Sequence, residues 1–278
     1  MSDANAPGAA GSSLVETAKG LPPIDVNEYG GKKEGVKQAM NRRLFMQLLV
    51  FRVPTLVRAT EPVSGGQKSA PDAVGAELVS ILKTRKIAGV VYADTMDPRS
   101  LALLSWSEDP AHFVRNVRPL FTEAPLNNVE LRDDFAMLGR SYSTGHEPDL
   151  EWYILRRPIE NVVNESTRWH VWYPLRRKGV FAKLEPIDQS HILREHAALG
   201  IAYGHQELAT DVRLACHGID ANDNEFVIGL VGKDLHPLSH LVQAMRKTRQ
   251  TSEFIERMGP FFVGYVLGSS NPSQDPRE

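Results

Sequence analysis

The order of predicted strands and helices occurs twice along this chain, and this repeat constrains the fold more than any other feature. The first run has its elements at 44–51, 71–86, 87–93, 100–106, 107–121 and 134–143. The second run has the corresponding elements at 168–175, 190–200, 205–218, 224–232, 236–249 and 259–268. Both runs follow the order strand, helix, strand, strand, helix, strand, which is that of a ferredoxin-like unit. The sequence therefore predicts an α+β chain with two ferredoxin-like halves whose sheets combine.

Composition marks the boundaries of these halves. Residues 1–40 are rich in Gly, Ala, Ser, Pro and Lys with little apolar periodicity, so we expect a mostly disordered arm. The N-terminal half with its linker then spans 41–167, the C-terminal half spans 168–268, and 269–278 forms a flexible tail. The linker at 144–167 is long enough to carry function or extra strands. Gly200 is a preferred residue just past a helix end, which predicts that the helix at 190–200 ends there.

Charge and motif content argue against several classes of function. The 278 residues are 24% charged with a net charge of -2, so nothing favours a nucleic acid or a membrane surface as partner. The single cysteine, Cys216, cannot form an intrachain disulfide. The first residues do not have the pattern of a secretory signal, and no apolar stretch approaches the roughly 20 residues that cross a bilayer. We therefore expect a cytoplasmic protein. Walker A, GxGxxG, CxxC and GxSxG motifs are missing, which weakens ATPase, dehydrogenase and hydrolase interpretations.

His196 is a candidate metal ligand on the predicted helix at 190–200. Ile192 lies one turn before it and Gly200 one turn after, so its imidazole should face the apolar side. On spacing alone, a histidine packed into the core is the more frequent outcome. Haem iron needs only one protein nitrogen, however, whereas other metal sites usually show several close ligands, which this sequence lacks. The residues therefore leave a core histidine and an axial haem ligand open.

Three further positions have both a structural and a functional interpretation. Tyr173 alternates with Trp172 along its strand, and it is either a packed strand residue or a phenol that faces a cofactor. The basic cluster at 176–178 is either a solvated turn or a clamp for carboxylates. Arg213 stands in an apolar strand and either points outward or lies buried with a partner, where it could stabilise a reacting anion.

Four segments of this chain together resemble the chlorite dismutase family, which includes coproheme decarboxylases. They are WYPLRRKG, REHAALGIAYG, RLACHGIDANDNEFVIGL and LVQAMRKTRQTSEFIERMGPFFVGYVLG. The resemblance spans 41–268 and is strongest from Trp169 onward. It implies tandem ferredoxin-like halves forming a dimeric α+β barrel, with haem b or coproheme in the C-terminal half. It also implies a homo-oligomer, often a pentamer, with a porphyrin and a small oxidant such as hydrogen peroxide or chlorite as partners.

The resemblance also assigns roles to individual residues. His196 matches the family's proximal iron ligand, Tyr203 matches a tyrosine near the haem, and Ser252 lies near a propionate contact. Tyr173 matches the catalytic tyrosine of coproheme decarboxylases, whose radical removes hydrogen from a propionate that then leaves as carbon dioxide. Arg177 stands where those enzymes have a lysine that steadies the propionate, so this chain keeps the charge but not an equivalent proton donor.

The resemblance defines less well the distal position, which is the residue on the side of the haem opposite the histidine ligand. Decarboxylases have glutamine there and chlorite dismutases have arginine. An ungapped match of RLACHGIDANDNEF puts Arg213 at this place, whereas a later insertion would put Asp211 or Ala209 there. The paired tryptophans of chlorite dismutases are not evident after WYPLRRKG. We therefore expect a peroxide-dependent coproheme decarboxylase or related haem peroxidase, with chlorite dismutase or a non-catalytic haem-binding sensor as alternatives.

Overall fold

The computed structural model describes residues 23–54 and 70–272, and the expectations for residues 1–22 and 273–278 lie outside the described residues. Its strands are β1 (Glu28–Lys33), β2 (Val36–Met40), β3 (Phe45–Arg52), β4 (Gly89–Asp94), β5 (Ser100–Ser107), β6 (Glu130–Leu131), β7 (Met137–Ser141), β8 (Trp169–Arg177), β9 (Thr210–Ala215), β10 (Phe226–Gly232), β11 (Ile255–Met258) and β12 (Phe262–Ser270). Its α-helices are α2 (Ala70–Thr84), α3 (Arg157–Val163), α4 (Pro186–His205), α5 (Leu235–Met245) and α6 (Arg249–Phe254). Shorter helical turns are η1 (Phe113–Val117), η2 (Arg118–Thr122), η3 (Asp133–Phe135), η4 (Trp152–Arg156) and η5 (Gly179–Lys183).

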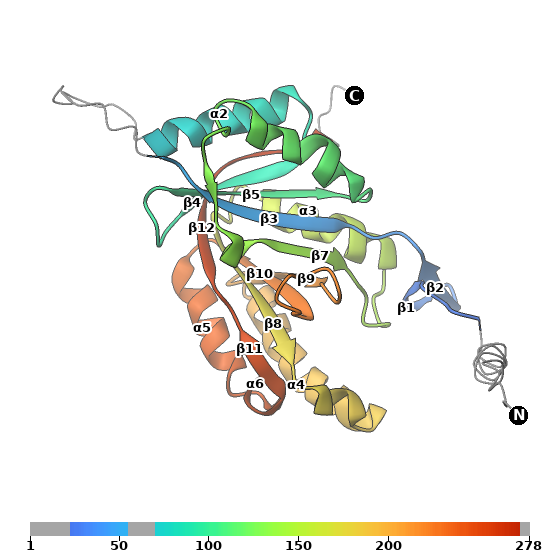
Figure 1. The fold of residues 1–278 in the computed structure, drawn as a ribbon. Helices are drawn as coiled ribbons and strands as arrows, with labels where there is room; N and C mark the ends of the chain where they lie inside the picture. Colours follow the sequence, from blue (N-terminus) through green and yellow to red (C-terminus); the bar gives the residue numbers. More distant parts are fainter. Residues whose placement is uncertain (1–22, 55–69, 273–278) are drawn as a thin grey trace, which may run out of the picture.

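The main sheet closes into a barrel. Its strands follow the order β10, β9, β7, β3, β5, β4, β12 and β8, and β8 pairs back onto β10. The antiparallel pairs β7–β9 and β12–β4 join the two halves of the chain. Figure 1 shows α2 on one side of this barrel and α4, α5 and α6 on the other. The predicted α+β fold with two ferredoxin-like halves in a dimeric-type barrel is therefore confirmed, and both halves come from one chain.

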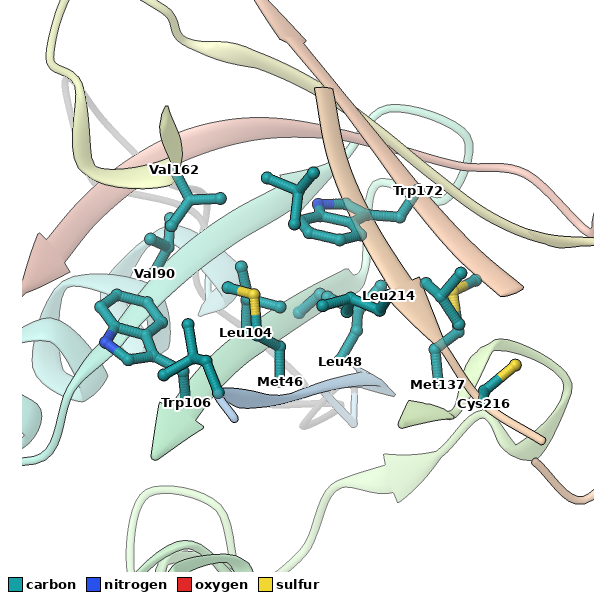
Figure 2. Packing of buried hydrophobic residues seen from close by; sticks show 14 of the residues in the cluster. Met46, Leu48, Val90, Leu104, Trp106, Met137, Val162, Trp172, Leu214 and Cys216 are labelled. Atoms are coloured by element: carbon teal, nitrogen blue, oxygen red, sulfur yellow. The ribbon is translucent and has the colours of Figure 1, made fainter. Parts of the chain in front are cut away.

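Alternation along the strands gives each half two apolar faces. Residues that point into the barrel form one shared core, which includes Met46, Leu104, Trp172 and Leu214 (Figure 2). The outer face of the N-terminal half packs against α2, η1 and η2, and the outer face of the C-terminal half packs against α4 and α5. Because strand side chains alternate, Trp172 enters the barrel while its neighbour Tyr173 faces the helices.

The structure differs from the sequence-based predictions in three places. Residues 28–40, expected within a disordered arm, form the β1–β2 hairpin, which the Gln38 amide ties to the linker by donating to the Glu147 carbonyl at 3.1 Å and accepting from Leu150 N at 3.0 Å. The linker itself folds into η4 and α3, where helices replace the expected loop or strands. The helix expected to end at Gly200 continues to His205, because an interior glycine costs only about 1 kcal/mol relative to alanine.

Gly229 gives the first test of this packing. A Cβ on Gly229 would lie 2.6 Å from ring carbons of Trp172, and Gly229 pairs directly with Trp172 across β8 and β10. We expect Gly229→Ala to destabilise the fold by about 1–3 kcal/mol, since the buried indole must shift. Gly179→Ala is the matched control, because nothing lies within 4 Å of its Cβ position. Urea denaturation followed by circular dichroism measures both, and equal midpoints for the two variants would contradict this packing argument.

Candidate functional site

One row of side chains crosses the outer face of the C-terminal half. Ile228 pairs with Tyr173 on one side and with Arg213 on the other, so the three side chains lie next to each other under α4 and α5. Tyr173 and Ile228 belong to the apolar cluster of this face, together with Leu238 and Leu241 of α5. The sheet therefore presents a phenol and a guanidinium on the same apolar surface.

His196 faces this row from α4. Its Nδ1 lies 3.2 Å from Thr248 Oγ1, and the Thr248 hydroxyl lies 2.7 Å from the Met245 carbonyl oxygen, to which it donates. Thr248 must then accept from His196 Nδ1–H, which leaves the lone pair on Nε2. Burial and the nearby Arg213 charge lower the pKa of His196, so this neutral form is favoured. The imidazole is therefore prepared as a single nitrogen ligand, with a partner that sequence reasoning did not name.

The α4 face around His196 suits a flat group. Gly200 and Gly204 follow His196 at intervals of one helical turn, so the three residues form a stripe along α4. A Cβ on Gly200 would meet only Met245 Cε at 3.8 Å, and one on Gly204 only the Ala209 carbonyl oxygen at 3.9 Å. In this 20-residue helix only Ile192 is fully buried. One imidazole nitrogen, with two glycines that add no side chain beside it, would fit an iron porphyrin that His196 holds.

Arg213 points toward the helices within a charged cluster. Its Nε lies 3.2 Å from Asp211 Oδ2, and its guanidinium also hydrogen-bonds the Tyr153 hydroxyl. Asp211 in turn contacts Arg157 at 2.6 Å. The charges of Arg213 and Arg157 together lower the pKa of the Asp211 carboxyl. The sequence left open whether Arg213 points into solvent or is held by a partner, and the structure shows it held by Asp211 and Tyr153. Asp211 shares this face and orients Arg213, whereas Ala209, the other alternative, packs in the apolar cluster.

Tyr173 is almost fully buried beneath the helices. Its ring stacks on Phe261 with centroids 4.5 Å apart. Burial and the Asp211 carboxylate raise the pKa of its phenol, which therefore stays protonated at neutral pH. Arg246, at the end of α5, is the cation that lies near this phenol. A cavity of about 440 Å³ is lined by Phe261, Arg257 and Asp134 among others, and His196 is not part of its lining.

The remaining candidates lie at the edges of this face. Arg177 Nε is 3.2 Å from Glu225 Oε2, and its guanidinium covers the rings of Phe181 and Phe226. The Tyr203 hydroxyl hydrogen-bonds His240 Nδ1 on α5. Ser252 Oγ donates to the Thr248 carbonyl at 2.9 Å, one turn after the residue that holds His196. The structure therefore puts Tyr173 and Arg213 on either side of Ile228, and the Arg213 charge acts on His196 of α4.

Thr248, Tyr153 and Arg157 are site residues that sequence reasoning missed. The long linker was one signal for Tyr153 and Arg157, since its helices supply both. Thr248 precedes α6 and gave no signal, because a threonine before a helix is usually only its cap. Within residues 23–54 and 70–272, no group of three or more His, Cys, Asp and Glu side chains could hold a metal ion. In the same ranges, no helix is both long and apolar enough to span a membrane.

Comparisons with known proteins identify relatives of this fold. Residues 150–267 match the chlorite dismutase family model. A candidate chlorite dismutase has a TM-score of 0.62 at 14% identity, over 84% of this chain and 98% of its own. A variant of the Candidatus Nitrospira defluvii chlorite dismutase in complex with cyanide has a TM-score of 0.60 at 13% identity, over 80% and 90%. A haem-binding protein from Thermus thermophilus has a TM-score of 0.60 at 15% identity, over 81% and 91%. No curated protein matches at a significant level.

Proposed function

Since residues 150–267 match the chlorite dismutase family model, we propose that this protein binds coproheme and uses hydrogen peroxide to decarboxylate it to haem b. One observation carries the proposal. Thr248 accepts the Nδ1 proton of His196, which leaves Nε2 as a ligand nitrogen on the helix that packs over the sheet face of Tyr173. A ligand nitrogen and a buried phenol are the two groups that a tyrosine-dependent oxidation of a bound porphyrin needs.

His196 and Thr248 hold and orient the porphyrin in this proposal. Nε2 would bind the iron, and the Nδ1–H bond to Thr248 keeps the ring in one orientation. When bound, the iron supplies the two-electron reduction of peroxide to water. The Thr248 hydroxyl is a neutral acceptor, so His196 keeps its Nδ1 proton. Its Nε2 would therefore donate less electron density to the iron than it would if a carboxylate accepted the Nδ1 proton.

Tyr173 carries oxidising equivalents to the propionate. Its phenol loses one electron and one proton, and the phenoxyl oxygen then takes a hydrogen atom from the propionate side chain. Loss of a second electron releases carbon dioxide and leaves a vinyl group. Each decarboxylation thus consumes one propionate, one hydrogen peroxide and one proton, and yields one vinyl group, one carbon dioxide and two waters. The burial that raises the pKa of Tyr173 keeps this hydrogen on the phenol between turnovers.

Two arginines are available for the carboxylates. Arg177 would hold a propionate in exchange for its contact with Glu225. Arg246 lies closer to the reacting phenol, since its charge acts on the Tyr173 hydroxyl. Guanidinium groups bind carboxylates with two parallel hydrogen bonds, so either can orient a propionate without transferring a proton. Tyr203 and Ser252, at the two edges of the face, are proposed to contact the porphyrin periphery.

The proposal is tested by incubating the full chain with iron coproporphyrin and hydrogen peroxide. Mass spectrometry should show sequential loss of two carboxyl groups, with haem b as the final product. Bleaching of the porphyrin without decarboxylation would contradict the proposed reaction, and binding without turnover would favour a haem-binding sensor. The homo-oligomeric assembly and the cytoplasmic location stay predictions.

Chlorite conversion is the second candidate function, and the contacts that hold Arg213 favour it. Asp211 and Tyr153 fix this guanidinium where its charge acts on His196, so it could keep an anion near a bound iron. If the haem-loaded protein converts chlorite, we expect Arg213→Ala to slow oxygen release by roughly 100-fold, as for loss of one stabilising donor. Arg168→Ala is the control, since Arg168 lies over Tyr265 away from this face. An oxygen electrode decides, and no oxygen from the unmodified protein excludes this function.

A further inference from the structure

Three polar aromatic side chains lie inside the barrel, on the opposite side of β8 from Tyr173. His170 and Trp172 alternate with Tyr173 along β8, and Tyr92 reaches them from β4. All three have 0% of their surface exposed. Trp172 projects among the apolar side chains of the barrel core in Figure 2. The proposed decarboxylation uses none of these groups, so their presence in an otherwise apolar interior needs a separate explanation.

Tyr92 and His170 form a donor–acceptor pair with a defined proton. His170 Nε2 lies 3.0 Å from the Thr167 carbonyl oxygen, which can only accept, so Nε2 carries the ring proton. Nδ1 then has a lone pair, and the Tyr92 hydroxyl, 2.9 Å away, donates to it. Burial lowers the pKa of His170 to about 4, so the imidazole is neutral at pH 7. The phenol proton of Tyr92 therefore lies on a hydrogen bond to an unprotonated base.

Two glycines make room for this arrangement. A Cβ on Gly264 would lie 3.0 Å from Tyr92 Cδ1, and Gly264 pairs with His170 across β12 and β8. A Cβ on Gly229 would lie 2.6 Å from the Trp172 ring. The Trp172 indole N–H lies close to the Tyr92 hydroxyl. Among the described residues it makes no hydrogen bond. Trp172 is thus the sequence neighbour of the outward-facing Tyr173 and lies on the same face of β8 as His170.

We propose that Tyr92 and His170 form a one-electron, one-proton redox site inside the barrel, with Trp172 as the connection to Tyr173. A phenol and an imidazole together cost desolvation that two apolar rings of similar size would not. The two side chains satisfy each other's hydrogen bonds together with the Thr167 carbonyl, and neither is exposed to solvent. What the pair adds over apolar packing is a place for an electron hole whose proton stays nearby.

The oxidation step balances within the pair. Tyr92 gives one electron to a one-electron oxidant, its O–H bond breaks, and the proton moves to Nδ1 of His170. The products are a neutral tyrosyl radical, an imidazolium that still donates Nε2–H to Thr167, and the reduced oxidant. An oxidised phenol is a far stronger acid than imidazolium, so the proton transfer is downhill despite the burial of His170. The choice of the Tyr173 phenoxyl radical as this oxidant rests on the proposed function. In that case Tyr173 regains its hydrogen as the electron from Tyr92 plus a proton from solvent.

The test uses the full chain before any porphyrin is added, so its outcome is independent of decarboxylation. Photogenerated ruthenium(III) tris-bipyridine is the oxidant, and electron paramagnetic resonance detects the radical. With 3-fluorotyrosine incorporated only at position 92, we expect the longest-lived tyrosyl signal to show fluorine splitting. The matched control carries the label at the partly exposed Tyr265, where we expect splitting only in a short-lived component.

His170→Asn removes the base and keeps an acceptor near the Nδ1 position. We expect the lifetime of the Tyr92 radical to fall at least tenfold, because the proton then has no site nearby. No fluorine splitting from position 92 in the folded, labelled chain would overturn the proposal, as would an unchanged lifetime in His170→Asn. If Tyr92 is oxidised as expected but coproheme is not decarboxylated, the redox site stands and only the proposed function fails.

Discussion

His196→Ala should remove defined haem binding from this protein. The variant loses the only side chain on the α4 stripe that can donate a nitrogen to iron, since Gly200 and Gly204 offer no ligand. We expect the affinity for haem to fall by more than about 100-fold, which exceeds the usual loss from removing an outer hydrogen-bond partner. Titration of the purified variant with haem, followed by its absorption spectrum, measures this. Added imidazole should restore the spectrum of the unmodified protein.

Two further variants separate ligation from packing. His191→Ala removes an exposed histidine of the same helix and should bind haem normally. Thr248→Val keeps the imidazole but removes the acceptor of its Nδ1 proton, so we expect an intermediate loss of about 10–100-fold. A His196→Ala protein that binds haem with the unmodified spectrum would exclude this histidine as the ligand.

The sequence predicted those parts of the site that depend on local periodicity. The alternation in WHVWYPLRR puts Tyr173 on one face and Trp172 on the other, and the structure has both where expected. The helical spacing predicted an apolar environment for His196, whereas its neighbours in the structure are the Thr248 hydroxyl and the charges of Arg213 and Asp211. The repeat of six elements was sufficient for the fold, because each half builds one four-stranded sheet that closes against the other.

Orientation and partners could not be predicted, because they depend on residues distant in sequence. Arg213 is held in place through Tyr153, which comes from a linker helix 60 positions earlier. The partner of His196 is Thr248, 52 positions later. The end of α4 was wrong for a related reason, since the preference for glycine after a helix is local and α4 continues through Gly200 toward its contacts with α5.

Tyr173→Phe should abolish decarboxylation while leaving the fold and porphyrin binding intact. The phenylalanine keeps the ring that stacks on Phe261, so the apolar cluster loses only a hydroxyl. Without the O–H bond there is no hydrogen to lose and no phenoxyl oxygen to take one from the propionate. We expect product formation to fall by more than about 100-fold, the scale of losing a group that transfers protons. Mass spectrometry of the porphyrin after addition of peroxide measures it.

Tyr265→Phe is the control for this variant, because the Tyr265 ring makes an edge-to-face contact with Trp169 and is not part of the row of Tyr173, Ile228 and Arg213. It should decarboxylate coproheme at the normal rate. The buried redox pair adds a second expectation for Tyr173→Phe. If oxidising equivalents reach Tyr92 only through Tyr173, peroxide should no longer produce the Tyr92 radical in the loaded variant, whereas ruthenium(III) still should. Undiminished decarboxylation by a folded Tyr173→Phe protein would exclude the phenol as the group that attacks the propionate.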